Sequence, residues 1–199
     1  MRREELEQLH YIAPLANIAS ILSLGILSHK RAARVEHDTV AMPEIQERRE
    51  KVVVPGGRPL HEYVNLYINA RNKMMYKVKC KHGTRGLCVI RVSTQVLDLP
   101  DVVIADQNAS SDYVRFASSP WGLTRIDKDL VYARSWKHAD DPIEEMRHGS
   151  IMCSEVLVPE KVESRFILGV YAPTTASVSK IKDEFPDLSV TSNGDLFFR

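Results

Sequence analysis

The apolar residues of this chain form many short runs of strand length, and no regular alternation of strands with helices connects them. The pattern is clearest at Tyr63–Ile68, where polar and aromatic side chains alternate with Val64, Leu66 and Ile68. This period of two indicates a half-buried strand. Chains with many short strands and few short helices fold as α+β proteins rather than as doubly wound sheets. We therefore expect an α+β fold, with further strands at 10–12, 87–92, 102–105, 156–158 and 166–171.

Fewer segments have the features of a helix. Residues 18–24 follow Asn17, which suits a helix N-cap, and precede Gly25, which suits the position beyond a C-terminus. Pro43 favours the first turn of a second helix. The remaining expectations are short helices at 127–136 and 177–185, irregular structure at 110–125, a polar loop at 137–150 and a hairpin turn at Asn193-Gly194.

Composition excludes several classes of protein. The 27 Lys and Arg residues nearly balance the 26 Asp and Glu residues, and 44% of the chain is hydrophobic, as in an ordinary globular protein. No apolar run approaches the roughly 18 residues of a membrane span, and the N-terminus is charged. The three cysteines do not form a disulfide framework. We expect a single domain over residues 1–199 that acts as a monomer in the cytoplasm.

Two charged residues stand beside predicted strands. Arg71 follows the Tyr63–Ile68 strand, and a guanidinium carries five donors in a rigid fork that suits phosphate oxygens. Glu155 opens an apolar strand, where a carboxylate either reaches solvent or has a task. Surface salt bridges would also explain both residues. Cys80, His82 and Cys88 lack the spacing and the fourth ligand of a zinc site, so we expect no metal.

Residues 30–58 contain a dense group of seven cations, from which we expect this segment to be the most basic part of the chain. They form either a solvated helix face with glutamate partners or a segment that follows a phosphate backbone. The cations are Lys30, Arg31, Arg34, Arg48, Arg49, Lys51 and Arg58.

Five stretches, in this order and spacing, resemble the DarT family of toxin enzymes over roughly residues 8 to 172. No single stretch is decisive, but the ordered set is fairly specific. They are HYIAPLANIASILSLGILSH, EYVNLYINARNKMMY, VVIADQNAS, IDKDLVYARSW and SEVLVPEKV.

The resemblance implies an ADP-ribosyltransferase-like fold, with two packed, mostly antiparallel sheets and short peripheral helices around an NAD cleft. Residues 30–58 would then be a basic loop-helix insertion. It implies transfer of ADP-ribose from NAD to a base of single-stranded DNA, thymine first and guanine second. It also implies a toxin whose partner is a macrodomain-type antitoxin.

The resemblance assigns roles to individual residues. Glu155 and Arg71 match the family's catalytic pair. The NAD site would include His10, Tyr11, Ile12, Asn17, Gly25, Arg31, Tyr67 and Arg71. The DNA contacts would be Arg48, Arg49, Lys73, Met74, Arg147, His148 and Ser154. Lys73 departs from the family, in which many members have proline there.

Three other functions remain compatible with these residues. The same fold could modify RNA or protein. An NAD-dependent RNA 2′-phosphotransferase would use basic cleft residues rather than a glutamate. A catalytically silent nucleic-acid-binding module would not need Arg71 and Glu155 in their motif contexts.

Overall fold

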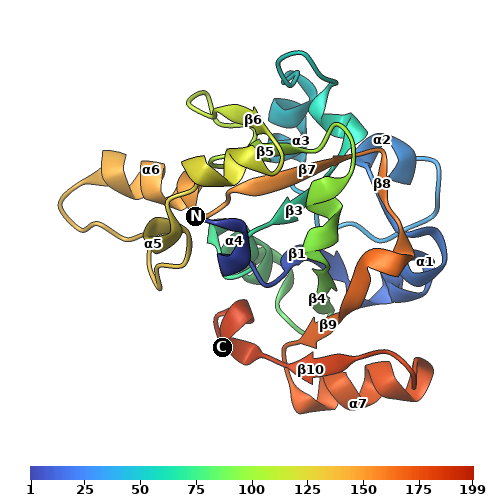
Figure 1. The fold of residues 1–199 in the computed structure, drawn as a ribbon. Helices are drawn as coiled ribbons and strands as arrows, with labels where there is room; N and C mark the ends of the chain where they lie inside the picture. The colour runs from blue at the N-terminus through green and yellow to red at the C-terminus, as the bar shows by residue number, and fades with distance from the viewer.

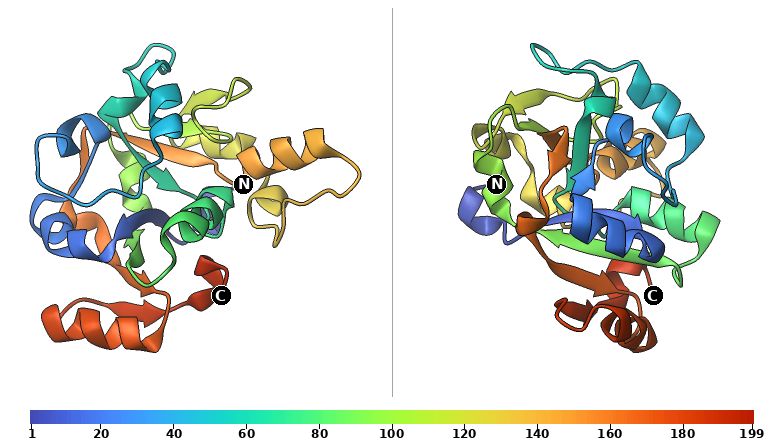
Figure 2. Two further views of the ribbon diagram at one scale, coloured as in Figure 1. Left: turned by 180° about the vertical axis from the view of Figure 1, so that it is seen from behind. Right: turned by 90° about the vertical axis from the view of Figure 1, so that its right-hand side faces the viewer.

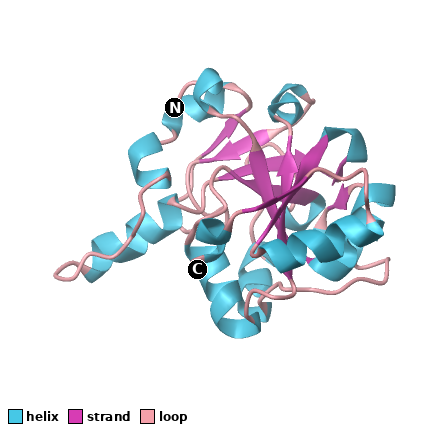
Figure 3. Ribbon diagram, turned by 90° about the horizontal axis from the view of Figure 1, so that it is seen from below, coloured by secondary structure: helices cyan, strands magenta, loops and turns pink.

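The computed structural model describes residues 1–199, and its centre is an eight-stranded sheet with helices on both faces (Figures 1 and 3). The strand order is β10-β9-β4-β1-β3-β7-β5-β6. A separate two-stranded sheet pairs β2 with β8. The strands are β1 (Leu9–Pro14), β2 (Ile26–Leu27), β3 (Tyr63–Tyr67), β4 (Leu87–Val92), β5 (Val103–Ala105), β6 (Phe116–Ser118), β7 (Glu155–Pro159), β8 (Lys161–Val162), β9 (Ile167–Ala172) and β10 (Val190–Ser192). The α-helices are α1 (Ile18–Leu24), α2 (His29–Ala32), α3 (Pro43–Glu50), α4 (Lys73–His82), α5 (Lys128–Val131), α6 (Pro142–Ile151) and α7 (Thr175–Glu184).

The expectation of an α+β fold is confirmed, but the expectation of two packed sheets is wrong in one respect. The eight strands form one sheet that is nearly divided in its middle, because β1 and β3 are joined by the single residue pair His10–Tyr67. We call this pair the seam. On one side lie β10, β9, β4 and β1, and on the other lie β3, β7, β5 and β6. All pairings in the large sheet are antiparallel except that of β9 with β10.

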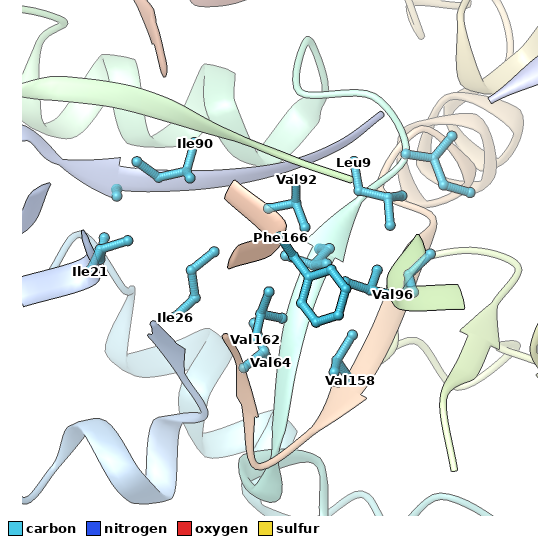
Figure 4. Packing of buried hydrophobic residues seen from close by; sticks show 14 of the residues in the cluster. Leu9, Ile21, Ile26, Val64, Ile90, Val92, Val96, Val158, Val162 and Phe166 are labelled. Atoms are coloured by element: carbon cyan, nitrogen blue, oxygen red, sulfur yellow. The ribbon is translucent and has the colours of Figure 1, made fainter. Parts of the chain in front are cut away.

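The two faces of the sheet bury unequal cores. One face contributes to a cluster of 27 buried residues, in which Phe166 packs among aliphatic side chains from several strands (Figure 4). The other face carries two smaller clusters, of 10 and 6 residues. Tyr67 belongs to the first of these and Tyr63 to the second. The second face of the sheet is therefore covered by two separate small clusters, and β3 contributes a tyrosine to each of them.

Helix α1 has the bounds that the sequence predicts, but its N-terminus is built differently. Asn17 has helical backbone angles and makes no capping bond. Gly25 ends the helix with φ of +83°, and a Cβ there would lie 2.3 Å from the Val162 carbonyl oxygen. Only glycine therefore allows β2 to leave α1 and pair with β8.

The polar segment 137–150 is not a loop, because most of it forms α6. Asp141 caps this helix by accepting a bond from the Glu144 amide at 2.9 Å, and Pro142 occupies its first turn. These are ordinary helix-start signals, and the polar composition of the segment obscured them. Together, residues 128–151 project from the body of the molecule (Figures 1 and 2). Residues 110–125 likewise contain β6 and a short 3₁₀ helix at Trp121–Arg125.

The expected hairpin at Asn193-Gly194 is also absent. No strand follows β10, so Asn193-Gly194 has no second strand to connect to. Strand β10 instead pairs in parallel with β9, and helix α7 supplies the crossover that such a pair needs. Gly194 instead begins a 3₁₀ helix, Gly194–Phe197. This C-terminal segment returns to the second face of the sheet, where Phe197 is fully buried.

Candidate active site

A cavity of about 150 Å³ opens on the second face of the sheet, between the two small cores. Strands β1 and β3 form its floor, α3 and residues 37–42 form one wall, and α4 forms another. A neighbouring cavity of about 260 Å³ shares Pro14, Asp38, Thr39 and Val40 with the first. Sites for ligands of drug size and above usually occupy about 300–1,000 Å³, so a dinucleotide would need both cavities. Of the expected cofactor and DNA residues, the first cavity is lined by Tyr11, Ile12, Asn17, Arg49, Tyr67 and Met74.

Glu155 lies behind this cavity and is fully buried. Arg49 Nη1 donates to both carboxylate oxygens, at 3.1 and 3.0 Å, and the backbone amide of Ala109 donates to Oε1 at 3.1 Å. A buried carboxylate needs such partners because desolvation is costly. Arg49 lines the cavity and Glu155 does not, so the guanidinium stands between the carboxylate and the open space.

The sheet register fixes the position of Glu155. It pairs with Tyr67 of β3 on one side and with Ala105 of β5 on the other. Tyr67 in turn pairs with His10 across the seam. Directly paired residues point to the same face of a sheet, so His10, Tyr67 and Glu155 form one row that leads from β1 to the buried Glu155 carboxylate.

Burial sets the ionisation of the aromatic groups in this row. The pKa of Tyr67 is well above its usual range because the ring is buried, and the Glu155 charge adds to the effect. Its hydroxyl therefore stays protonated and can donate a hydrogen bond. Burial lowers the pKa of His10 to about 4. The neutral His10 ring donates from Nδ1 to the Ile68 carbonyl at 3.1 Å and accepts at Nε2 from Gln8 at 3.2 Å.

Asn17 holds the segment that walls the cavity. Its Nδ2 donates to the Asp38 carbonyl at 2.8 Å, and its Oδ1 accepts from the Asp38 amide at 3.0 Å. The side chain thus serves the backbone of a segment 21 residues away rather than its own helix. Two bonds to one residue fix both the position and the orientation of that segment.

Arg71 lies elsewhere. Its guanidinium carbon is 4.2 Å from the centre of the Phe198 ring, and its Nε is 3.5 Å from Asp195. It also donates to the Arg134 carbonyl. The structure therefore places Arg71 against the C-terminal segment, and the arginine in contact with Glu155 is Arg49.

The other expected site residues are dispersed. Arg48 is exposed on α3, and Lys73 lies against Gly149. Arg31 pairs with Glu160, and Arg147 pairs with Glu144. Buried His148 donates from Nε2 to the Leu130 carbonyl at 3.0 Å. Ser154 Oγ donates to the Asp106 carbonyl at 2.8 Å. Gly25 packs against Val162 outside the cavity.

Some cavity residues escaped the sequence analysis. One of them is Asn108, which accepts bonds from the Ser110 amide and hydroxyl and also lines the cavity. The sequence does indicate which way Arg49 points, because Arg49 follows the apolar residues Met42 by seven positions and Ile45 by four. Residues at this spacing share one helix face. The other lining residues that were missed include His29, His37, Thr39 and Gln46.

No three His, Cys, Asp or Glu side chains converge in a way that would hold a metal ion. The three cysteines are unpaired, with Cys80 exposed and Cys88 and Cys153 buried. No helix is both long and apolar enough to cross a membrane.

Comparison with known families identifies the family of this chain. The family model described as "ssDNA thymidine ADP-ribosyltransferase, DarT" matches residues 10–195. The chain belongs to the DarT family. Both the cavity and the Arg49–Glu155 pair lie within the matched residues.

Several DarT proteins are similar along most of this chain. A DNA ADP-ribosyl transferase of Thermus sp. is 25% identical over 90% of this chain and 88% of its own length. A Thermosipho africanus fusion of a DNA ADP-ribosyl transferase with a DNA ADP-ribosyl glycohydrolase is 27% identical over 88% of this chain. This chain spans about half of that fusion protein, 45% of its length.

The solved DarT structures have the same fold. Thermosipho africanus DarTG in complex with ADP-ribose superposes with a TM-score of 0.83 over 96% of this chain and 51% of the other, at 25% identity. Thermus sp. DarT in complex with ADP-ribosylated ssDNA gives a TM-score of 0.80 over 97% of both chains, at 24% identity. Thermus sp. DarT in complex with NAD+ gives 0.77.

Proposed function

We propose that this DarT protein transfers ADP-ribose from NAD to thymine bases of single-stranded DNA and acts as the toxin of a toxin–antitoxin pair. The observation that carries the proposal is the buried Glu155 carboxylate, set behind a cavity within a chain that matches the DarT family from residue 10 to 195. The catalytic unit is the 1–199 domain, acting as a monomer in the cytoplasm.

In this reaction the bond between nicotinamide and the anomeric carbon breaks, and its electron pair leaves with nicotinamide. Positive charge builds on the ribose, as in glycoside hydrolysis. Glu155 stabilises this charge from its fixed place in the sheet. A thymine nitrogen then bonds to the anomeric carbon, and its proton passes to the Glu155 carboxylate, which acts as general base. An unstacked base reaches the site at least cost in single-stranded DNA.

We assign to Arg49 the role of the essential arginine, in place of Arg71. Arg49 already contacts both Glu155 oxygens and faces the cavity. When NAD enters, the guanidinium turns toward its phosphates, for which the planar fork is well shaped, and Glu155 becomes free to meet the ribose. Tyr11, Asn17 and Tyr67 surround the same space and would position the donor.

A second protein completes the proposed system. The Thermosipho relative joins a DNA ADP-ribosyl transferase and a DNA ADP-ribosyl glycohydrolase in one chain. A separate macrodomain-type glycohydrolase would serve this chain as antitoxin by removing ADP-ribose from its DNA product. Addition of such an enzyme should return the modified DNA to its original mass.

Intact-mass measurement tests the reaction directly. The protein is incubated with NAD and an oligonucleotide that contains one thymine, beside the same oligonucleotide with that thymine replaced, its RNA equivalent and its duplex. We expect one ADP-ribose mass increment on the thymine-containing single strand only.

Glu155→Gln is the matched control, because the amide has the same shape and still accepts a bond from Arg49. It should give no increment. An increment on RNA or on the protein itself would overturn the DNA assignment, and binding of DNA without any increment would favour a silent binding module.

A further inference from the structure

The exposed face of α4 has a charge that the reaction just proposed leaves unexplained. Between Glu62 and Asp98 the chain has no acidic residue, although it has seven lysines and arginines. The segment 30–58, by contrast, balances its seven cations against five acids. The expectation that 30–58 is the most basic region is therefore wrong, and the greatest net positive charge lies around α4.

The lysines of α4 have no acidic partners. Lys77, Lys81 and nearby Arg85 are exposed, and none of them forms a salt bridge with a carboxylate. In the 30–58 segment, four cations pair with glutamates, namely Lys30, Arg31, Arg49 and Arg58. The other three, Arg34, Arg48 and Lys51, are exposed and form no salt bridge, but five acids of the same segment offset their charge. Free cations are the ones that gain most from neutralising a polyanion.

Helical spacing gathers these charges on one face. Lys73, Lys77 and Lys81 recur every four residues, so they lie along one side of the helix, over about 12 Å at 1.5 Å per residue. Tyr76 follows Lys73 by three residues, so it is a neighbour of that lysine on the helix surface, and it is 42% exposed. Its ring packs edge-on against Trp136 and Phe198, with centroids 5.6 and 5.4 Å away. The ring is thereby held in place with one part still open to solvent.

This face begins beside the active site. Asn72 caps α4 by accepting bonds from the Met74 and Met75 amides, both at 2.9 Å. Met74 and Val78, on another side of the helix, line the cavity. The N-terminus of α4 also lies close to Cys153, which precedes Glu155 by two residues. Burial raises the pKa of the Cys153 thiol to about 12, and the backbone amides of Met74 and Lys73 act in the opposite direction. In Figure 2, left, α4 is the green helix that faces the viewer and leads from this point toward the edge of the molecule.

We propose that the exposed face of α4, with Lys73, Tyr76, Lys77 and Lys81 on the helix and Arg85 beyond it, binds the single-stranded DNA that continues past the modified base. The lysines and Arg85 neutralise successive phosphates, and the Tyr76 ring stacks on a base. Lys73 connects this face to the active site. Glu145, the acid that lies near Lys73, is engaged by Lys137. The proposal depends on the DNA activity proposed above and adds a binding surface to it.

Salt dependence tests the proposal. The affinity of a fluorescent single strand for the protein is measured by anisotropy at several salt concentrations. For single strands the logarithm of the affinity falls with a slope of about 0.7 per neutralised phosphate. Lys77→Ala/Lys81→Ala should therefore flatten the slope by about 1.4 and weaken binding on the order of tenfold at low salt. Lys180→Ala/Lys182→Ala on α7 removes the same charge from exposed positions at the far edge of the sheet and should change neither quantity.

Cys80 offers a second test that does not alter the charges. It is the only exposed cysteine and lies between Lys77 and Lys81 on the chain. Single-stranded DNA should slow the alkylation of Cys80 by N-ethylmaleimide. A cysteine placed on α7, in the variant Cys80→Ser/Ser179→Cys, should react at the same rate with or without DNA.

The outcomes separate this proposal from the proposed function. If the protein modifies DNA while the α4 variants keep the parental salt slope and Cys80 stays unprotected, the binding surface is refuted and the activity stands. If DNA protects Cys80 and no base is modified, the surface stands and the activity is refuted. Equal protection at Cys80 and at the α7 cysteine would mean that DNA coats the protein without preference, which also refutes the surface.

Discussion

Arg49 and Glu155 form a two-point contact in which one guanidinium nitrogen lies 3.1 and 3.0 Å from the two carboxylate oxygens. Their side chains are 7% and 0% exposed. The contact joins a helix with little apolar surface to a central strand of the sheet. It therefore ties the wall of the cavity to the proposed catalytic carboxylate, and we expect both activity and stability to fall when this contact is broken.

Loss of Arg49 should be costly in both respects. Arg49→Met leaves the buried Glu155 carboxylate with only the Ala109 amide, and an unpaired buried charge costs about 3–5 kcal/mol of unfolding free energy. Glu155→Gln should cost less, because the amide oxygen still accepts a bond from Arg49 and because the guanidinium lines the cavity, into which it can turn. Both variants should lose transfer activity by roughly 100-fold or more. Urea unfolding and the mass assay measure the two effects. In the double variant, the stability cost should be smaller than the sum of the single costs.

Arg71 should matter for the C-terminal segment rather than for the donor. Arg71→Ala removes the contacts with Phe198 and Asp195, which we expect to lower the unfolding free energy by on the order of 1–2 kcal/mol. NAD hydrolysis without DNA should persist. The measurement is the rate of nicotinamide release by Arg71→Ala and Arg49→Ala at saturating NAD. A loss of roughly 100-fold in Arg71→Ala, with its fold intact, would restore Arg71 as the catalytic arginine.

Asn17 should control the affinity for NAD. Asn17→Ala removes both bonds to Asp38, at about 1 kcal/mol each. The wall segment then loses its fixed position, so KM for NAD should rise roughly tenfold while kcat changes little. Limited proteolysis should also cut more readily within residues 33–42. Ser20→Ala removes a bond to the Asn17 carbonyl without touching the wall, and it should leave both readouts unchanged.

His10 should make the protein sensitive to acid. Its pKa is lowered by burial to about 4 in the folded chain, against about 6.5 when unfolded. Between these values the unfolded chain binds the proton and the folded chain does not, so the unfolding free energy falls as pH falls from 6.5 to 4. The contribution is roughly 3 kcal/mol over the whole interval, at about 1.4 kcal/mol per pH unit.

The test compares urea unfolding of the parent and of His10→Gln at pH 7.5 and pH 5. Carboxylates affect both proteins alike, so the difference between them isolates the histidine. The parent should lose about 2 kcal/mol more than the variant between these conditions. Equal losses would show that His10 does not remain neutral in the folded protein.

The strands and the end of α1 were the parts of this fold most readily predicted. β4 has the predicted bounds because five of its six residues, all but Arg91, are apolar, and Gly25 ends α1 because no other residue tolerates its backbone angles beside Val162. The helices α4 and α6 were missed. Each depends on an asparagine or aspartate cap that a polar context conceals, at Asn72 and at Asp141.

The candidate site was predicted in part. Glu155 was singled out because a carboxylate inside an apolar strand is costly to bury without a partner or a function. Its arginine partner, Arg49, was not predicted to contact it. Arg48 and Arg49 are adjacent and chemically identical, and only the helix phase set by Met42 and Ile45 separates them. Contacts such as that of Asn17 with Asp38 depend on the tertiary path of the chain, which local patterns do not encode.

The seam has a consequence for where the sheet opens most easily. The two halves of the sheet share only the residue pair His10–Tyr67, so their separation breaks few backbone hydrogen bonds. The neighbouring strands β1 and β4, by contrast, pair at six positions. Opening at the seam should therefore require far less free energy than global unfolding. The row that ends at Glu155 crosses this weakest line of the sheet. The cavity and the Glu155 carboxylate thus lie close to the line where the two halves of the sheet join. We expect a small change of twist along this line to widen the cavity while each half stays intact.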